Sequence, residues 1–455
     1  MGRTASRDLR SVRPGDPDGS SEGAVAAGAL AAGDVLHSLV TELFPIPRSL
    51  TGEGVRETLR RLREIVPLEI REVPSGTRVL DWTVPKEWNV REAWIRDPRG
   101  RTVVDFRDCN LHVVGYSVPV HARLPRDELV RHVHTLPDHP DWIPYRTSYY
   151  DESWGFCMAH RQLEALEEGE YEVRIDASLE DGGLTYGECY LTGELDEEIL
   201  ISCHVCHPAL ANDNLSGIAV ATYLAKGLHE RPRRYSYRFL FVPGTIGSIA
   251  WLALNEGALR RIRGGLVLAG VGDPGGLTYK RSRRGDAEID RAAAHVLRHS
   301  GEEHDVQEFI PYGYDERQYC SPGFDLPVGC LMRTPWGTYP EYHTSADDPG
   351  LVRPESLAGS LAVCRAIVEV LEGNRTYLNL SPKGEPQLGR RGLYDRVGGR
   401  VDRKDRILAL LWVLNLSDGG QDLLAIADRA GMPFGRVRWA ADALLDAGLL
   451  EERRP

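Results

Sequence analysis

The segment 199–219 constrains the fold of this chain more than any other, because it joins a short apolar run to a polar turn and a helical pattern. The apolar run 199–201 is typical of a buried strand, and His204 follows it. Asp213 lies nine residues later, in an Asn-Asp-Asn-Leu-Ser-Gly turn that leads into the next helical pattern. Open α/β sheets place ligand-binding side chains at such strand ends. The segment therefore predicts a strand–turn–helix unit that presents polar side chains at the end of a sheet.

Apolar runs alternate with helical patterns along most of the chain. Strands are expected at 172–175, 184–191, 199–203, 237–242, 265–269 and 327–332. Helices are expected at 217–228, 248–255, 286–299 and 354–371. Chains that alternate in this way form sheets with helices on both faces. The expected fold class is α/β, with a mixed, largely parallel sheet flanked by helices.

Composition divides residues 1–385 into parts. Residues 1–33 are rich in Gly, Ala, Ser and charged residues, so we expect a disordered tail. The main α/β domain is expected to take residues 34–88 and 150–385. Short β-rich runs separated by turn residues indicate a small β-rich insertion domain at 89–149.

The C-terminal region has the pattern of a separate helical domain. A linker rich in Gly and Arg is expected at 386–399, before a domain at 400–455. Helical patterns at 405–414, 422–430 and 436–447, followed by the start of a strand at 448, predict a winged helix. Residues 400–455 contain nine Lys or Arg and nine Asp or Glu, which is not the basic footprint of a DNA-binding domain. We therefore expect a packing or homo-oligomerisation element, with DNA binding as the less favoured alternative.

Charge and hydropathy exclude several classes of function. The formal net charge of −12 argues against electrostatic attraction to nucleic acid or anionic membranes. No apolar stretch is long enough to span a bilayer, and no apolar segment follows the N-terminal arginines, so neither a membrane anchor nor a signal peptide is expected. The eight scattered cysteines are too few for a disulfide scaffold. These features predict a cytoplasmic protein with reduced thiols.

Two polar segments far apart in the sequence suggest a metal site assembled by folding. The first contains His204 and Asp213, and the second, 341–347, contains His343 with carboxylates on both sides. Imidazole and carboxylate are ligands that hold a hydrolytic zinc. A lone histidine could instead be a hydrogen-bonded core residue, and Cys-His-Val-Cys-His at 203–207 also matches a haem-attachment or redox motif. The turn around Asp213 favours the metal interpretation.

The pattern His-(x)8-Asp-Asn-x-Ser-Gly, together with a later helix opened by Gly-Ser and a final His-Thr-x-x-Asp, resembles zinc-dependent aminopeptidases with a bacterial leucyl aminopeptidase-like fold. The chain is more similar to an aminopeptidase-like family that carries a β-rich insertion and a C-terminal winged helix. The similarity covers residues 35–455, and its clearest segments are 43–59, 73–77, 81–88, 199–219 and 315–324.

The resemblance implies a set of metal ligands for one or two zinc ions. His204 and His343 match ligands of the family, and Asp213 matches the carboxylate able to bridge two metals. Asp273, after the strand that ends near residue 269, matches a later acidic ligand, although its Gly-Asp-Pro-Gly context is also a good turn. Asp347 would support the ligands without binding the metal.

The chain departs from the family pattern at Gly244. The family places a glutamate there, which deprotonates water or ligates a second metal, and loss of a positioned base costs about 10²–10⁴ in rate. Three explanations remain open. Another carboxylate, from Glu341, Glu316 or Glu188, could substitute. The reaction could need no strong base, as with an activated ester, an imine or a cyclisation. Alternatively, the site could only bind.

The segment 315–319 is expected to line the substrate cleft. Arg317 could bind a substrate carboxylate, and Tyr319 is a further candidate for substrate contact. A solvated charged loop is the competing interpretation. The expected function is a zinc-dependent, aminopeptidase-like hydrolase of a small aminoacyl or peptide-like amide, with a biosynthetic intermediate among the candidate substrates. The alternative is a metal-containing binding or regulatory protein that acts through its winged helix.

Overall fold

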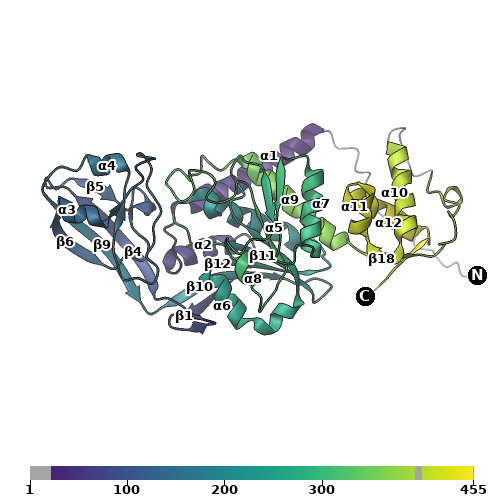
Figure 1. Ribbon diagram of the computed structural model, residues 1–455, viewed down its shortest axis with the longest axis horizontal. Helices are drawn as coiled ribbons and strands as arrows, with labels where there is room; N and C mark the ends of the chain where they lie inside the picture. The colour runs from purple at the N-terminus through teal and green to yellow at the C-terminus, as the bar shows by residue number, and fades with distance from the viewer. Residues whose placement is uncertain (1–21, 395–401, 454–455) are drawn as a thin grey trace, which may run out of the picture.

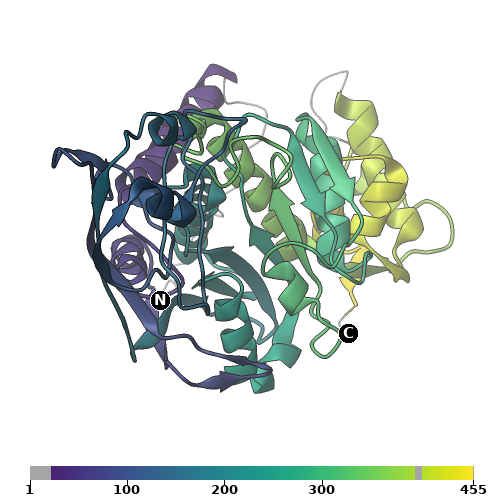
Figure 2. The ribbon, with the colours of Figure 1, turned by 60° about the vertical axis from the view of Figure 1, so that its left-hand side comes forward.

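The computed structural model describes residues 22–394 and 402–453 as three parts arranged in a row (Figure 1). A β-rich domain lies at one end, the α/β domain lies in the middle, and a C-terminal module lies at the other end. The view in Figure 2 again places the β-rich domain and the C-terminal module on opposite sides of the α/β domain. No helix in the described residues is long and apolar enough to cross a membrane.

An eight-stranded mixed sheet forms the centre of the α/β domain, with the order β1-β10-β12-β11-β13-β16-β14-β15. Its four central strands, β12, β11, β13 and β16, are parallel, whereas β1, β10 and β14 pair antiparallel with a neighbour. The strands are β1 (Glu69–Pro74), β10 (Gly183–Leu191), β11 (Glu198–His204), β12 (Ser236–Val242), β13 (Ile262–Leu268), β14 (Leu277–Lys280), β15 (His304–Gln307) and β16 (Val328–Met332).

Helices cover both faces of this sheet, because its central strands are apolar on both sides. In β11, Ile199, Ile201 and Cys203 contribute to one core cluster, whereas Leu200 contributes to the other. The first face is covered by α1 (Glu22–Leu43), α2 (Glu53–Arg63), α5 (Gly217–His229), α7 (Glu288–Ser300) and α9 (Pro354–Gly373). The second is covered by α6 (Ile246–Leu254) and α8 (Glu316–Tyr319). This arrangement confirms the predicted fold class.

The β-rich domain is built on a four-stranded antiparallel sheet with the order β5-β4-β9-β6. Its strands are β4 (Glu87–Arg96), β5 (Thr102–Asp105), β6 (Val120–Pro125) and β9 (Glu170–Glu180). The sequence placed 172–175 in the main domain, but β9 pairs with β4 and β6, so this sheet extends to residue 180. A half-buried strand has the same alternating pattern in either sheet, so the sequence could not identify its partner.

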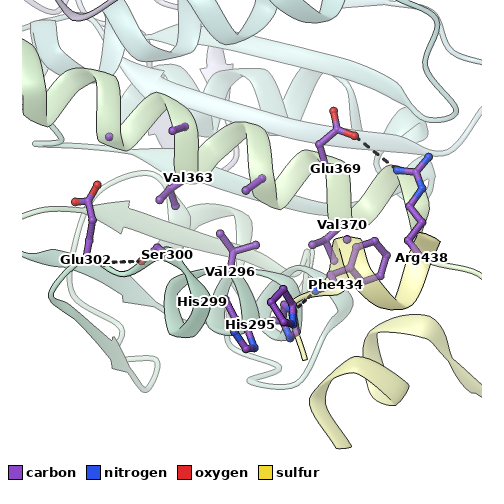
Figure 3. Close-up of a pocket in the computed structure, with 15 residues that line it drawn as sticks. His295, Val296, His299, Ser300, Glu302, Val363, Glu369, Val370, Phe434 and Arg438 are labelled. Carbon is purple, nitrogen blue, oxygen red and sulfur yellow. Dashed lines mark hydrogen bonds and ion pairs between the residues drawn. The ribbon is translucent and has the colours of Figure 1, made fainter. Parts of the chain in front are cut away.

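The C-terminal module contains the helices and the wing expected of a winged helix. Its elements are β17 (Thr376–Asn379), α10 (Asp402–Leu416), β18 (Asp418–Asp422), α11 (Leu423–Ala430), α12 (Phe434–Asp446) and β19 (Leu450–Glu452), and its sheet has the order β18-β17-β19. Strand β17 belongs to this sheet although it precedes the predicted linker. The module is attached to α7, where His295 Nδ1 lies 2.7 Å from Asp428 Oδ1 and His295 Nε2 accepts a hydrogen bond from Phe434 N (Figure 3).

Other differences from the predicted elements concern short or weakly patterned segments. Residues 22–33, assigned from sequence to the tail, lie in α1, and residues 1–21 lie outside the described residues. Strand β1 was not anticipated because it is a polar edge strand in which only Val73 is buried. Strands β14 and β15 are four residues long, too short to show periodicity.

Candidate metal centre and adjoining cleft

The candidate centre lies at the carboxyl ends of the parallel strands. Strand β11 ends at His204, and Gly244 and Asp273 follow the neighbouring strands β12 and β13. The turn 211–216 then leads into α5 and carries Asp213. His343 comes from a distant loop and has a left-handed backbone conformation, with φ of 58°. Because parallel strands end at the same edge of the sheet, the fold brings these segments together.

Asp213 is the centre of the cluster. Its Oδ1 lies 2.6 Å from His204 Nε2, and its Oδ2 lies 3.0 Å from His343 Nε2. The hydroxyl of Tyr314 also donates a hydrogen bond to Oδ2, at 2.8 Å. Burial opposes ionisation of this carboxyl, but the imidazoles of His207 and His204 hold the pKa of Asp213 well below its usual range. Three residues predicted as ligands, His204, Asp213 and His343, are thus in contact.

His207 is a further member of the cluster that the sequence did not nominate. Single ligand atoms of His204, His207 and Asp213 lie within 4.8 Å of one another, and all three residues are buried. Burial lowers the pKa of His207 to about 3, so the imidazole is neutral and able to bind a metal. The buried Arg48 donates a hydrogen bond from Nε to the His207 carbonyl, at 2.9 Å. The signal in the sequence was the second histidine of the 203–207 motif.

The donor set fits a zinc ion. Imidazoles and a carboxylate, buried together at a strand end, are the ligands that zinc takes in proteins. Asp347 holds the turn that carries Asp213, because its Oδ1 and Oδ2 accept hydrogen bonds from the backbone N–H groups of Asn212 and Asp213. Burial, with the nearby charge of Asp213, raises the pKa of Asp347 to about 8. Asp347 therefore contacts the turn that carries a ligand, as the sequence suggested.

Asp273 lies near the cluster but is held by other partners. Its Oδ1 accepts hydrogen bonds from Thr334 Oγ1, at 2.5 Å, and from Gly275 N, at 2.9 Å. Its Oδ2 accepts a hydrogen bond from Asn212 Nδ2, at 3.1 Å. The carboxylate is thus used in a turn, the alternative that its sequence context offered. Its assignment as a ligand stays a prediction.

A carboxylate lies beside Gly244. A Cβ atom at this position would lie 3.1 Å from His204 Cβ and 3.7 Å from Asp315 Oδ2. Asp315 Oδ1 accepts a hydrogen bond from Ser248 Oγ, at 2.7 Å, whereas the buried Oδ2 has no hydrogen-bond partner within the described part of the chain. Burial raises the pKa of Asp315 to about 6. The sequence predicts that the segment 315–319 lines the substrate cleft, but it does not single out Asp315 as a candidate base.

The three carboxylates predicted as substitutes for the missing glutamate at 244 have other partners. Glu316 is buried and forms an ion pair with Lys280 Nζ, at 2.5 Å. Glu188 forms ion pairs with Arg238 and Arg71. Glu341 is partly exposed and contributes its carbonyl to hydrogen bonds from Thr344. The structure brings none of these three carboxylates into the cluster around Asp213.

A cleft of about 490 Å³ adjoins the metal centre. It is lined by Leu50, Trp82, Tyr149, Tyr150, His207, Gly244, Thr245, Ile246, Ile249, Tyr312, Gly313, Tyr314, Arg317, Trp336, Tyr342 and His343. Arg317 is thus placed where a substrate could contact it. Tyr319 does not line the cleft: it is fully buried, and its hydroxyl lies 2.9 Å from Ser202 Oγ.

The cysteine motif has no features of a redox or haem site. Cys203 and Cys206 are buried free thiols. Burial raises the pKa of Cys206 to about 12 and that of Cys203 well above its usual value. Reactive cysteines need an accessible thiolate. The histidines of the motif face the metal centre, whereas its thiols pack in the interior.

Comparison with known proteins places these features in a family context. Residues 37–374 match the family described as a domain of unknown function, DUF4910, and residues 375–452 match a winged helix-turn-helix family. A protein from Clostridium acetobutylicum, named as a polysaccharide biosynthesis protein with an aminopeptidase-like domain, is 52% identical over 92% of this chain and 96% of its own length.

Solved structures show the same architecture. A crystal structure of a Clostridium acetobutylicum protein described as a peptidase has a TM-score of 0.90 and 50% identity, covering 95% of this chain and 99% of that one. A zinc aminopeptidase from Bacillus subtilis has a TM-score of 0.53 and 13% identity, covering 74% of this chain and 94% of that one. At this identity, the second likeness is one of fold.

Proposed function

This chain belongs to the aminopeptidase-like family described as DUF4910, and from that premise we propose that it is a zinc-dependent hydrolase of a small aminoacyl or peptide-like amide. The proposal depends on one observation above all: His204, His207, Asp213 and His343 converge beside a cleft and near Asp315, whose Oδ2 has no hydrogen-bond partner in the described residues. A metal-ligand set, a substrate-sized cavity and a proton acceptor are the parts that amide hydrolysis needs.

His204, His207, Asp213 and His343 would hold the zinc. A bound zinc would supply Lewis-acid chemistry, polarising the amide carbonyl and making water nucleophilic at neutral pH. The chain's own residues would orient the substrate. The Tyr314 hydroxyl is held by Asp213 Oδ2 and by the hydroxyl of Tyr342, 2.6 Å away, so it is fixed at the boundary between metal centre and cleft.

Asp315 would take the role that the family gives to the glutamate at position 244. Glycine at 244 leaves space between Asp315 Oδ2 and the cleft, which Gly244 itself lines. With a pKa of about 6, Asp315 is ionised at neutral pH, and its Oδ2 is available to accept a proton from an attacking water. Ser248 holds the other oxygen and so fixes the direction of the carboxylate.

The substrate would be an intermediate of biosynthesis. The named role of the Clostridium acetobutylicum relative in polysaccharide biosynthesis makes amides of amino sugars the first compounds to test. The volume of the cleft, about 490 Å³, suits a small molecule of this kind.

The test combines metal analysis with a substrate screen. Purified protein should contain zinc, and turnover of aminoacyl and acyl amides of amino sugars should stop with a chelator and return with added zinc. Asp315→Asn should retain zinc and lose most activity, whereas the control Glu341→Gln should retain both zinc and activity. Zinc without turnover on any amide would favour a metal-containing binding protein, and protein that takes up no zinc would refute the proposal.

A further inference from the structure

The cleft beside the metal centre is lined by a cationic side chain without a matching carboxylate. Its lining includes Arg317 but, among the residues that the structure describes, no aspartate or glutamate. Arg317 Nε is buried without a hydrogen-bond partner, and no described carboxylate lies within 4.0 Å of the guanidinium nitrogens. A buried donor left unpaired is costly unless a ligand supplies the acceptor. The lining therefore presents a cationic donor and no carboxylate for a substrate ammonium, because Asp315 lies beyond Gly244 and outside the lining.

The mouth of the cleft is aromatic. Five Trp, Tyr or Phe side chains are strongly exposed in the described part of the chain, and four of them, Trp82, Tyr149, Tyr150 and Tyr312, line this cleft. Trp82 and Tyr150 lie with ring centroids 6.0 Å apart. Exposed aromatic side chains gathered at one opening are typical of a binding surface that packs against a flat or apolar ring.

We infer that this site takes anionic amides: molecules with a ring, a carboxylate that pairs with Arg317, and an acylated amine in place of a free ammonium. A guanidinium matches a carboxylate in geometry and charge. A free ammonium would instead meet a cation and find no carboxylate in the lining, which disfavours ordinary peptides with a free N-terminus. The inference narrows the proposed function from aminoacyl amides to amides whose amine is acylated, and it rests on that function for the reaction but not for the binding.

Binding to full-length, zinc-free protein tests the inference separately from catalysis. N-benzoylglycine, its neutral amide N-benzoylglycinamide and the cationic glycine anilide are similar in size and each carry a ring. By calorimetry, N-benzoylglycine should bind at least about tenfold more tightly than its amide, the gain expected of a charge-assisted hydrogen bond. Glycine anilide should bind most weakly. Zinc is left out because a carboxylate could otherwise bind the metal.

Arg317→Gln should reduce the preference for N-benzoylglycine to less than about twofold. The control Arg91→Gln removes an exposed arginine of the β-rich domain, paired with Asp176, and should leave the preference intact. Arg317→Lys keeps the charge and should keep part of the preference, which covers the case in which the glutamine variant does not fold. A preference that survives Arg317→Gln, equal binding of glycine anilide, or no binding of any probe would overturn the inference. Absent turnover would count only against the proposed function.

Discussion

The cleft beside the metal centre and the cavity at the junction with the C-terminal module are similar in size. They differ in whether their polar groups have partners within the protein. The junction cavity, about 560 Å³ between α7, α9 and α12, is the larger of the two (Figure 3). Its charged groups have protein partners: His295 with Asp428, Arg438 with Glu369, and Glu302 with Arg333. Beside the cleft, three consecutive residues, 315–317, each have a buried polar atom without a hydrogen-bond partner.

This difference shows which cavity is prepared for a ligand. At the junction, hydrogen bonds and ion pairs hold the C-terminal module against the α/β domain, so the polar groups there stabilise the protein. Beside the cleft, the desolvation of Asp315 Oδ2 and Arg317 Nε is not offset by a hydrogen bond from the described residues. Such unoffset costs are typical of functional sites. Between these two cavities, volume alone would have selected the junction.

The largest expected effect comes from the metal centre. His204→Ala removes a buried imidazole that contacts Asp213, so zinc content and chelator-sensitive turnover should both be lost. The matched control is His299→Ala, an exposed histidine that lines the junction cavity. Elemental analysis and activity of the control should equal those of the wild type. Retention of zinc by the His204 variant would mean that the metal is held elsewhere.

Lys280→Met should have the next largest effect, on stability. The Lys280 ammonium is buried, pairs with Glu316 and donates a hydrogen bond to the Tyr312 carbonyl, at 2.7 Å. Removing it leaves a buried carboxylate unpaired, which typically costs about 3–5 kcal/mol of unfolding free energy in a urea titration. Arg298→Met, which removes an exposed partner of Asp428 near the junction, should cost less than about 1 kcal/mol.

The Lys280–Glu316 pair is a contact that the sequence alone could not predict. Glu316 is a candidate base from its polar segment, but its role depends on Lys280, 36 residues earlier on strand β14. The strands 199–203 and 237–242 were predictable because buried strands have apolar runs. The grouping of His204, Asp213 and His343 in one site was predictable from motif spacing. His207 and Asp315 were not, because their contribution depends on which side chains face the same space after folding.

Asp315→Asn should lower turnover by about 10²–10⁴, the usual effect of losing a positioned base. Burial raises the pKa of Asp315 to about 6 in the zinc-free protein, and a zinc ion nearby would lower it, so wild-type turnover should fall at or below about pH 6, where the carboxyl becomes protonated. Rates measured from pH 5 to 8 check this. In Asp315→Asn, the residual rate should lose that dependence, and an unchanged profile would exclude Asp315 as the base.

The same substitution should stabilise the zinc-free protein at alkaline pH. The folded-state pKa of Asp315, about 6, lies above the usual value of 3.8, so ionisation costs more in the folded state than in the unfolded state. Wild-type stability is therefore lost as pH rises from about 4 through 6, whereas the variant avoids this loss. The gain should reach roughly 3 kcal/mol at pH 8 and shrink at pH 5. Urea titrations at both pH values measure it, and a destabilised variant at pH 8 would contradict the raised pKa of Asp315.

The smallest effect is expected at the junction. Arg438 and Glu369 lie 3.7 Å apart with side chains that are 41% and 47% exposed, so Arg438→Ala should change the free energy of unfolding by less than about 1 kcal/mol. Zinc content and turnover should match the wild type, because the metal centre lies at the strand ends of the α/β domain and shares no lining residue with this cavity. If turnover instead fell with stability unchanged, the junction would be coupled to the cleft, and the distinction between a structural and a functional cavity would fail.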